Sequence, residues 1–304
     1  MLRTALLAAS RSTAVRRLVE RGPGASVVNR FVAGATVDDV VAVIRAITAD
    51  RLVTVDHLGE DTTDRAQAEA VVAAYKTLLA RLDAEGLAGR AEVSVKLSAL
   101  GQSLPIDAEK ITVDAAREVC AAAAAAGTTV TVDMEDHTTT DATLAVVREL
   151  RVDFPWVGAV LQSQLRRTEG DCRELAVPGS RVRLCKGAYD EPAAVAFRRA
   201  ADVDLSFVRC MKVLMGGGGL PMVATHDPRL VEIARYLGRQ AGAEYELQML
   251  YGVRPRAQVA LAAEGERVRV YVPYGTEWYG YFMRRLAERP ANMAFFLRTL
   301  LTRG

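Results

Sequence analysis

Hydrophobic and polar positions divide most of the chain into two alternating kinds of segment. Short runs rich in β-branched residues alternate with longer stretches whose apolar residues recur at helical spacing, as in Ala68, Val71, Val72 and Tyr75. Strict alternation of strand and helix requires parallel strands joined by right-handed crossovers, and eight such units favour a closed (β/α)8 barrel over an open sheet. The eight predicted strands are Leu52–Asp56, Glu92–Leu97, Thr128–Asp133, Val157–Gln162, Val182–Lys186, Pro221–Thr225, Tyr245–Met249 and Val268–Val272.

Residues at the segment boundaries support this division. Gly127, Gly242 and the run Gly216–Gly219 each end a predicted helix just before a strand, as C-cap glycines do. Because the glycine run precedes a strand, it belongs to the bottom of the barrel and is not a phosphate loop; no GxGxxG follows a strand either, which excludes a Rossmann module. The residues expected to open helices with a capping oxygen or a first-turn proline are Asp64, Asp107, Thr140 and the pair Asp227-Pro228.

Helices are also predicted outside the repeating units. Two lie before the first strand, at about 12–21 and 37–49, and another follows Pro290, from Ala291 to Leu301. We therefore expect residues 1–50 to form an N-terminal helical segment packed on a catalytic barrel of residues 51–304. Since barrels of about 250 residues are common as one domain, and no linker divides the chain, we expect one domain overall.

Charge and cysteine usage exclude several classes of protein. The chain has 39 Lys and Arg against 37 Asp and Glu, a balance that argues against nucleic-acid binding. Its four cysteines lie far apart without metal-ligand spacing, so we expect free thiols in a reducing compartment and no metal site. No apolar run is long enough for a membrane span. We expect a cytoplasmic protein, with peripheral contact at the inner membrane as the closest membrane association.

Polar residues concentrate at the carboxyl ends of the predicted strands, where barrel enzymes place their chemistry. All three histidines and two of the five lysines fall there. Lys96 and Asp133 end consecutive strands at matching depth, and strands about 5 Å apart allow the two side chains to pair. Such a pair either holds the positive charge of the lysine over the mouth of the barrel, where a ligand would bind, or only stabilises the fold. The polar strand ends are Asp56-His57, Lys96, Asp133–His137, Gln162, Gln164, Arg183, Lys186, Thr225-His226, Gln248 and Tyr271.

A second candidate feature is the segment Tyr281–Arg289, which follows the last strand. Tyr281, Arg284, Arg285 and Glu288 share one face of a helix. Two adjacent guanidiniums held by a glutamate can bind a carboxylate through directional charged hydrogen bonds, which suits an amino- or hydroxy-acid substrate. The alternative is an exposed surface helix whose charges pair with one another.

These residues resemble the proline dehydrogenase family, specifically its short monofunctional bacterial type. The matching segments occur in order and cover nearly the whole barrel, so their combination is specific where each alone is not. They are Asp56–Glu60, Val93–Ser98, Val132–Glu135, Val160–Gln162, Arg183–Tyr189, Ala224–Asp227, Glu246–Gly252, Tyr271–Thr276 and Tyr281–Arg289.

The resemblance implies a distorted (β/α)8 barrel that binds FAD and oxidises L-proline to Δ1-pyrroline-5-carboxylate, with electrons passing to a quinone. It makes pyrroline-5-carboxylate dehydrogenase a candidate partner. Asp133 and Arg183 become catalytic residues, because Asp133 orders Lys96 and Arg183 favours the negative charge of a reduced flavin. The implied substrate-binding residues are Lys96, Tyr271, Tyr281, Arg284, Arg285 and Glu288. The implied cofactor-binding residues are Met134, Gln162, Arg183, Lys186, Gly187, Ala188, Tyr189, Thr225 and His226.

Glu60 follows the first strand, and we hypothesise that it is a gate, pairing with Arg284 when the site is empty and yielding to the substrate carboxylate. Three other functions stay open on the sequence. One is a flavin barrel of the methylenetetrahydrofolate-reductase type, which gives the paired arginines no role. Another is a non-catalytic proline-binding barrel. The third is a phosphate-handling aldolase, which a missing glycine-rich loop after the seventh and eighth strands disfavours.

Overall fold

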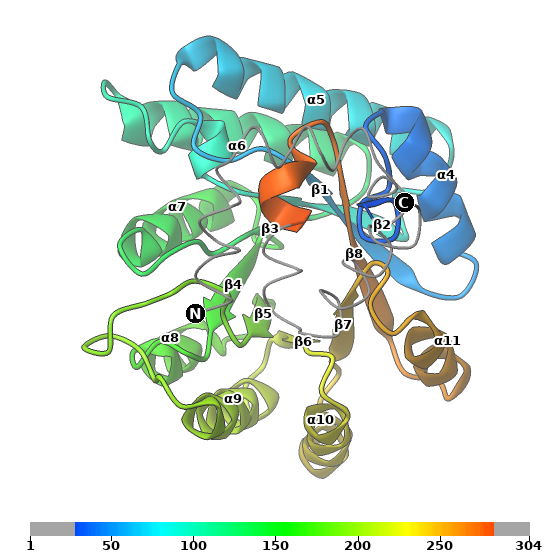
Figure 1. Ribbon diagram of the computed structural model, residues 1–304, viewed down its shortest axis with the longest axis vertical. Coiled ribbons are helices and arrows are strands. Elements are labelled where there is room, and N and C mark those ends of the chain that lie inside the picture. The colour runs from blue at the N-terminus through cyan, green and yellow to red at the C-terminus, as the bar shows by residue number, and fades with distance from the viewer. Residues whose placement is uncertain (1–27, 283–304) are drawn as a thin grey trace, which may run out of the picture.

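The computed structural model describes residues 28–282, and in it eight parallel strands close into a barrel in chain order, with helices arranged outside (Figure 1). The predicted (β/α)8 barrel is confirmed. Each predicted strand is present with shifted ends; the largest change is in the third, which keeps only three residues. The strands are β1 (Leu52–His57), β2 (Ala91–Val95), β3 (Val130–Val132), β4 (Gly158–Gln162), β5 (Arg181–Cys185), β6 (Leu220–Ala224), β7 (Glu246–Leu250) and β8 (Val268–Tyr274).

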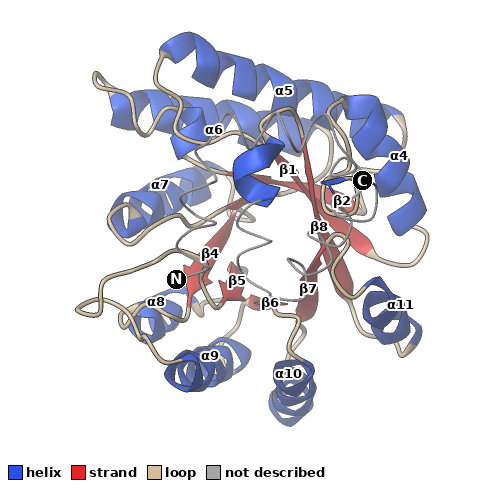
Figure 2. Ribbon diagram, in the orientation of Figure 1, coloured by secondary structure: helices blue, strands red, loops and turns tan. Residues whose placement is uncertain are grey.

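Helices follow the strands around the outside of the barrel (Figure 2). The predicted helix at 37–49 is confirmed as α4 (Val37–Ile47), which buries Val40, Val41 and Ile44. The predicted helices at 12–21 and 291–301 lie outside the described residues. The remaining helices are α5 (Arg65–Ala84), the short 3-10 helix η1 (Ser98–Leu100), α6 (Ala108–Ala125), α7 (Thr140–Asp153), α8 (Thr168–Leu175), α9 (Ala200–Met215), α10 (Pro228–Ala241) and α11 (Pro255–Ala263).

Capping residues define several helix ends. The Asp64 side chain accepts a hydrogen bond from the backbone N–H of Gln67 at 2.9 Å, and Asp227 caps α10 ahead of Pro228, both as predicted. Asp107 precedes α6 but makes no capping hydrogen bond, because its backbone is left-handed with φ of 53°. The prediction for Thr140 was wrong by one residue: Thr140 is the first residue of α7, and Thr139 precedes it without a side-chain cap.

The glycine run Gly216–Gly219 is structural, as predicted. It connects α9 to β6 and packs against the segment between α8 and β5. A Cβ atom on Gly217 would lie 2.5 Å from the carbonyl oxygen of Ala176, and one on Gly219 would lie 2.5 Å from that of Ser180. Both approaches are too close for any side chain, so glycine is required there.

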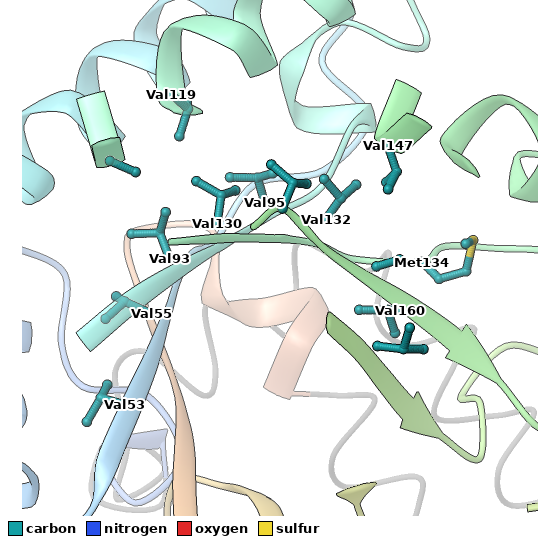
Figure 3. Close-up of a cluster of buried hydrophobic side chains, with 14 of the residues drawn as sticks. Val53, Val55, Val93, Val95, Val119, Val130, Val132, Met134, Val147 and Val160 are labelled. Carbon is teal, nitrogen blue, oxygen red and sulfur yellow. The ribbon is translucent and has the colours of Figure 1, made fainter. Parts of the chain in front are cut away.

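The main hydrophobic core lies between the strands and the helices. Val53 and Val55 of β1, Val93 and Val95 of β2, and Val130 and Val132 of β3 are all buried in it. Figure 3 shows these valines together with Val119 of α6 and Val147 of α7. Because side chains alternate along a strand, the intervening residues point into the barrel.

Charged and polar side chains fill much of the barrel interior. Glu92 of β2 pairs with Arg181 of β5, and Glu246 of β7 pairs with Arg269 of β8 at 2.7 Å. Burial would raise the pKa of Glu92, but Arg181, Arg269 and Arg183 together lower it below the ordinary value. The carboxylate therefore stays ionised inside the barrel and is satisfied by ion pairs from other strands.

Within residues 28–282, no helix combines the length and apolar character needed to cross a bilayer. Nor do His, Cys, Asp and Glu side chains of this part of the chain form a group suited to a metal ion.

Candidate active site

One cavity of about 1030 Å³ opens at the carboxyl ends of the strands. Every residue within 28–282 to which a catalytic, substrate-binding, cofactor-binding or gate role was assigned lines it. The structure therefore brings together groups that the sequence separates by more than 200 positions. Arg284, Arg285 and Glu288 lie outside the described residues. The predicted residues around the cavity are Glu60, Lys96, Asp133, Met134, Gln162, Arg183, Lys186, Gly187, Ala188, Tyr189, Thr225, His226, Tyr271 and Tyr281.

Asp133 and Arg183 form the centre of a buried hydrogen-bond network across the barrel. Asp133 Oδ1 accepts from Arg183 Nη1 at 2.7 Å and from Ser94 Oγ at 2.7 Å, and its Oδ2 accepts from Tyr271 Oη at 2.8 Å. Arg183 Nε donates to Gln248 Oε1 at 2.5 Å. Burial, together with the Asp133 charge, raises the pKa of Tyr271 well above its ordinary value, so the phenol stays protonated and donates.

Lys96 has a different main partner from the one predicted. Its Nζ lies 2.6 Å from Asp56 Oδ2 and 3.8 Å from Asp133 Oδ2, so the expected pairing with Asp133 is only the secondary contact. Both oxygens of Asp133 already accept shorter hydrogen bonds from Arg183, Ser94 and Tyr271. Burial alone would lower the pKa of Lys96, but Asp56, Asp133 and Glu60 raise it above its ordinary value, which keeps the lysine charged.

The three histidines do not share one role. Only His226 lines the cavity; its Nε2 accepts a hydrogen bond from the backbone N–H of Leu250 at 2.9 Å. His57 ends β1, but its ring packs edge-on against Tyr75 and Tyr274, with centroids 6.0 and 5.1 Å away. His137 contacts Glu191 in the loop after β5. All three histidines were predicted to lie at the functional end of the barrel, but only His226 lies at the cavity.

Most of the predicted cofactor residues lie on β5 or in the loops that follow β5 and β6. Lys186 Nζ lies 2.5 Å from Asp204 Oδ1 on α9 and 3.8 Å from Asp227 Oδ2. Gly187 has a left-handed φ of 106°, and a Cβ there would meet the Gln164 side chain at 2.4 Å. Glycine is favoured at this turn because its backbone is left-handed, and a Cβ would in addition require the Gln164 side chain to move.

Ser94 and Asp204 belong to the cavity region and were missed as site residues in the sequence. Ser94 donates to Asp133 and accepts from Arg183 Nη1 at 3.0 Å. A signal was present in the sequence, because Ser94 is two residues before Lys96 in the predicted strand Glu92–Leu97, and side chains two residues apart point to the same side. Asp204 lies within a helix, where no strand-end argument applies.

The loop that carries Glu60 is held by Ser98 of η1, which is itself bonded to the partly buried carboxyl group of Glu135. Glu135 Oε1 accepts from Ser98 Oγ at 2.6 Å, and Ser98 Oγ accepts from the backbone N–H of Asp61 at 3.3 Å. The Ser98 carbonyl also accepts from Thr62 Oγ1 at 2.9 Å. Glu60 is thus followed directly by two residues anchored to the loop after β2.

Replacing Glu135 with glutamine is expected to stabilise the protein at alkaline pH. Burial raises the pKa of Glu135 from 4.5 to about 7, although Ser98 and Lys96 oppose the rise. The folded protein therefore binds this proton more tightly than the unfolded chain, and wild-type stability falls as pH rises from about 4.5 through about 7. At about 1.36 kcal/mol per pKa unit, Glu135→Gln should gain up to about 3 kcal/mol at pH 8 and nothing at pH 4. Urea unfolding across this range measures it, and parallel pH curves for the two proteins would refute the assignment.

Comparison with known proteins places the chain in a family. The sequence profile described as proline dehydrogenase matches residues 42–298, which is most of the chain. The chain belongs to the proline dehydrogenase family. It is 38% identical over 276 residues to proline dehydrogenase 1 of Bacillus subtilis, covering 90% of each chain. It is 39% identical over 281 residues to proline dehydrogenase of Deinococcus radiodurans, covering 90% of this chain and 89% of that one.

Solved structures of proline utilization A proteins share the fold. The protein from Bdellovibrio bacteriovorus, inactivated by N-propargylglycine, superposes with a TM-score of 0.79 at 24% identity. That from Bradyrhizobium japonicum gives a TM-score of 0.71 at 22% identity. The chain covers 34% and 32% of these longer proteins, so the match concerns their barrel fold. The predicted membership of the family is confirmed, whereas the roles assigned to individual site residues stay predictions.

Proposed function

We propose that the protein oxidises L-proline to Δ1-pyrroline-5-carboxylate with bound FAD and passes the electrons to a quinone. The observation that carries the proposal is that one cavity is lined both by Lys96, Tyr271 and Tyr281, which are predicted to bind substrate, and by the residues predicted to bind cofactor. Family membership supports the substrate and the reaction. The quinone acceptor and a functional link to pyrroline-5-carboxylate dehydrogenase rest on the resemblance alone. A cytoplasmic location with peripheral membrane contact rests on the cysteine usage and apolar pattern of the sequence.

The residues present fit a flavin nucleotide. A cavity of about 1030 Å³ is at the upper end for small-molecule sites, about 300–1,000 Å³, which suits a dinucleotide-sized group with a small substrate beside it. Arg183 Nη2 is buried, has no hydrogen-bond partner among the described residues and lies 3.7 Å from Glu92 Oε1. Met134, Gln162, Arg183, Lys186, Gly187, Ala188, Tyr189, Thr225 and His226 are the residues proposed to hold the FAD.

When bound, the flavin would supply the acceptor for the hydride that leaves C5 of proline. Arg183 contributes a fixed positive charge, since Asp133, Ser94 and Gln248 hold its guanidinium in one orientation. Preorganised charge of this kind costs no reorganisation during the reaction and favours negative charge developing nearby. The Arg183 guanidinium also lies 5.3 Å above the Tyr271 ring, which restricts the tyrosine at the cavity wall.

Lys96 is proposed to act on the substrate amine through its charge. Asp56 and Asp133 hold the ammonium group at the cavity, and a neighbouring cation lowers the pKa of a bound amine. A neutral amine is required because its lone pair must assist hydride departure. Arg284 and Arg285, with Glu288, are proposed to hold the carboxylate, with Tyr271 and Tyr281 as walls and Glu60 as the gate.

Anaerobic titration of the purified protein tests this function. The protein is expected to be yellow, to lose its flavin absorbance when L-proline is added and to keep it when NADH is added. Reoxidation by a soluble quinone analogue, and not by NAD⁺, tests the proposed acceptor. Bleaching by NADH would instead indicate a reductase of the methylenetetrahydrofolate type, and protein that cannot take up FAD would indicate a non-catalytic barrel.

A further inference from the structure

The loop between β5 and α9, residues 186–199, carries four of the predicted cofactor residues and has no helix or strand of its own. The loop after β4 holds both of its ends. The backbone N–H of Gln164 donates to the Lys186 carbonyl at 2.8 Å, and the N–H of Phe197 donates to the Gln164 carbonyl at 2.8 Å. Arg166, in the same loop after β4, also donates to the carbonyl oxygens of Val195 and Ala193. Between these contacts, Glu191 extends toward the loop after β3.

A carboxylate in the middle of this loop contacts a histidine of the loop after β3. Glu191 Oε1 accepts a hydrogen bond from the backbone N–H of His137 at 3.0 Å, and Glu191 Oε2 contacts His137 Nδ1 directly. The Glu191 side chain is 3% exposed, whereas that of His137 is 30% exposed. In the tautomer whose Nδ1 carries the proton, this contact is a hydrogen bond that the ring donates to the carboxyl group.

The buried position of Glu191 depends on His137. A carboxylate removed from water needs charged or hydrogen-bonding partners, and both oxygens of Glu191 find them on this one residue. The same stretch is fixed further by Arg198, whose Nη1 donates to the Glu191 carbonyl and lies 3.0 Å from Asp190 Oδ1. If His137 loses its imidazole, the favourable response is for Glu191 to move into water and take residues 189–191 with it.

We propose that His137 and Glu191 form a clasp that positions the loop after β5 over the cavity and so limits the rate at which the cofactor leaves. The clasp joins this loop to the loop carrying Asp133 and Met134, on the far side of β4. Both residues are positioning residues, since neither lines a reacting centre; Glu191 borders the cavity and His137 acts through it. The part of the proposal that concerns FAD rests on the proposed function, whereas the closure of the loop does not.

Two measurements on matched variants test the clasp. The first is the rate of FAD release from the holoenzyme, followed by the rise in flavin fluorescence after dilution. The second is trypsin cleavage after Arg198 and Arg199, mapped by mass spectrometry in the presence and absence of FAD. His137→Ala should release FAD about tenfold faster, the effect of losing one charged hydrogen bond, and should be cut sooner at this site.

Control variants distinguish the loss of the His137–Glu191 contact from a general loss of stability. His137→Asn keeps a donor near the position of Nδ1 and should restore both rates to near wild type. Thr138→Ala changes a neighbour whose hydroxyl bonds only within its own loop, to Asp136, and should match wild type. Glu191→Ala should also release FAD faster than wild type, and adding His137→Ala to it should change neither rate further, because the contact between the two residues is already lost.

Unchanged FAD release and unchanged cleavage in His137→Ala would overturn the clasp, as would a loss that His137→Asn cannot restore. Failure of the wild-type protein to bind FAD would count against the proposed function instead. In that case, cleavage of the cofactor-free protein still decides whether His137 closes the loop.

Discussion

Asp133→Ala is expected to lower the free energy of unfolding by about 3 to 5 kcal/mol, the usual result of removing one partner of a buried ion pair. Arg183 is 4% exposed, and without Asp133 its Nη1 keeps only the Ser94 hydroxyl as an acceptor. Two buried cations, Arg183 and Lys96, would lose a shared counter-charge. Because the released guanidinium would no longer be fixed, kcat/KM for proline should fall by at least about a hundredfold.

Urea unfolding and steady-state kinetics measure both effects of Asp133→Ala. Tyr271→Phe is the matched control for the unfolding measurement, since it removes a single donor to the same carboxylate and should cost about 2 kcal/mol of unfolding free energy. A loss from Asp133→Ala no greater than that from Tyr271→Phe would show that the carboxylate charge contributes nothing at this position.

Lys96→Met is expected to have the second largest effect, about 3 kcal/mol or more of unfolding free energy at pH 8. Asp56 is 1% exposed, and Lys96 is its ion-pair partner at 2.6 Å. Burial already raises the pKa of Asp56, with the Lys96 charge opposing that rise, so removing Lys96 raises it further. The penalty is present above the ordinary pKa of the carboxyl group and disappears as pH falls and Asp56 takes up a proton.

A double-mutant cycle with Asp56→Asn isolates the pair. Asp56→Asn/Lys96→Met should be more stable than Lys96→Met alone, because the double variant buries no unpaired charge. Urea unfolding at pH 5 and pH 8 provides the comparison. A pH-independent loss in Lys96→Met, or a double variant whose loss is the sum of the two single losses, would contradict the pairing.

The sequence predicted the barrel because hydrophobic periodicity and capping signals agree along the whole chain. It also predicted which strand ends surround the cavity, since in a barrel these ends meet on one face. It could not decide the partner of Lys96. Val95 of β2 lies level with Val132 of β3, so continuing this register by one residue pairs Lys96 with Asp133, whereas Asp56 lies level with Ser94. Asp56 is nevertheless the closer partner, because competing donors occupy Asp133.

Whether a residue at a strand end belongs to the site also depends on which side of the strand its side chain faces. Asp56 points into the barrel, so the next residue, His57, points outward, where it meets Tyr75 of α5. Applying the two-residue alternation to the strand ends would have removed His57 from the candidate site. His137 and Glu191 lie in irregular loops 54 positions apart, where no periodicity acts and only the folded chain reveals their contact.

Within a strand of this barrel, the residues that stabilise the fold and the residues that form the polar interior occupy alternate positions. Odd-numbered positions of β1 and β2 hold the valines that pack on the outer helices, while the even-numbered positions Thr54, Asp56, Glu92 and Ser94 join the polar network beneath the cavity. In such a barrel, replacing the inward-facing residues can change the ligand that the cavity binds. The outward-facing residues, which pack the sheet against the helices, need not change. Conversely, replacing one of the outward-facing valines can destabilise the barrel even though the adjacent residue, which faces the cavity, is unchanged.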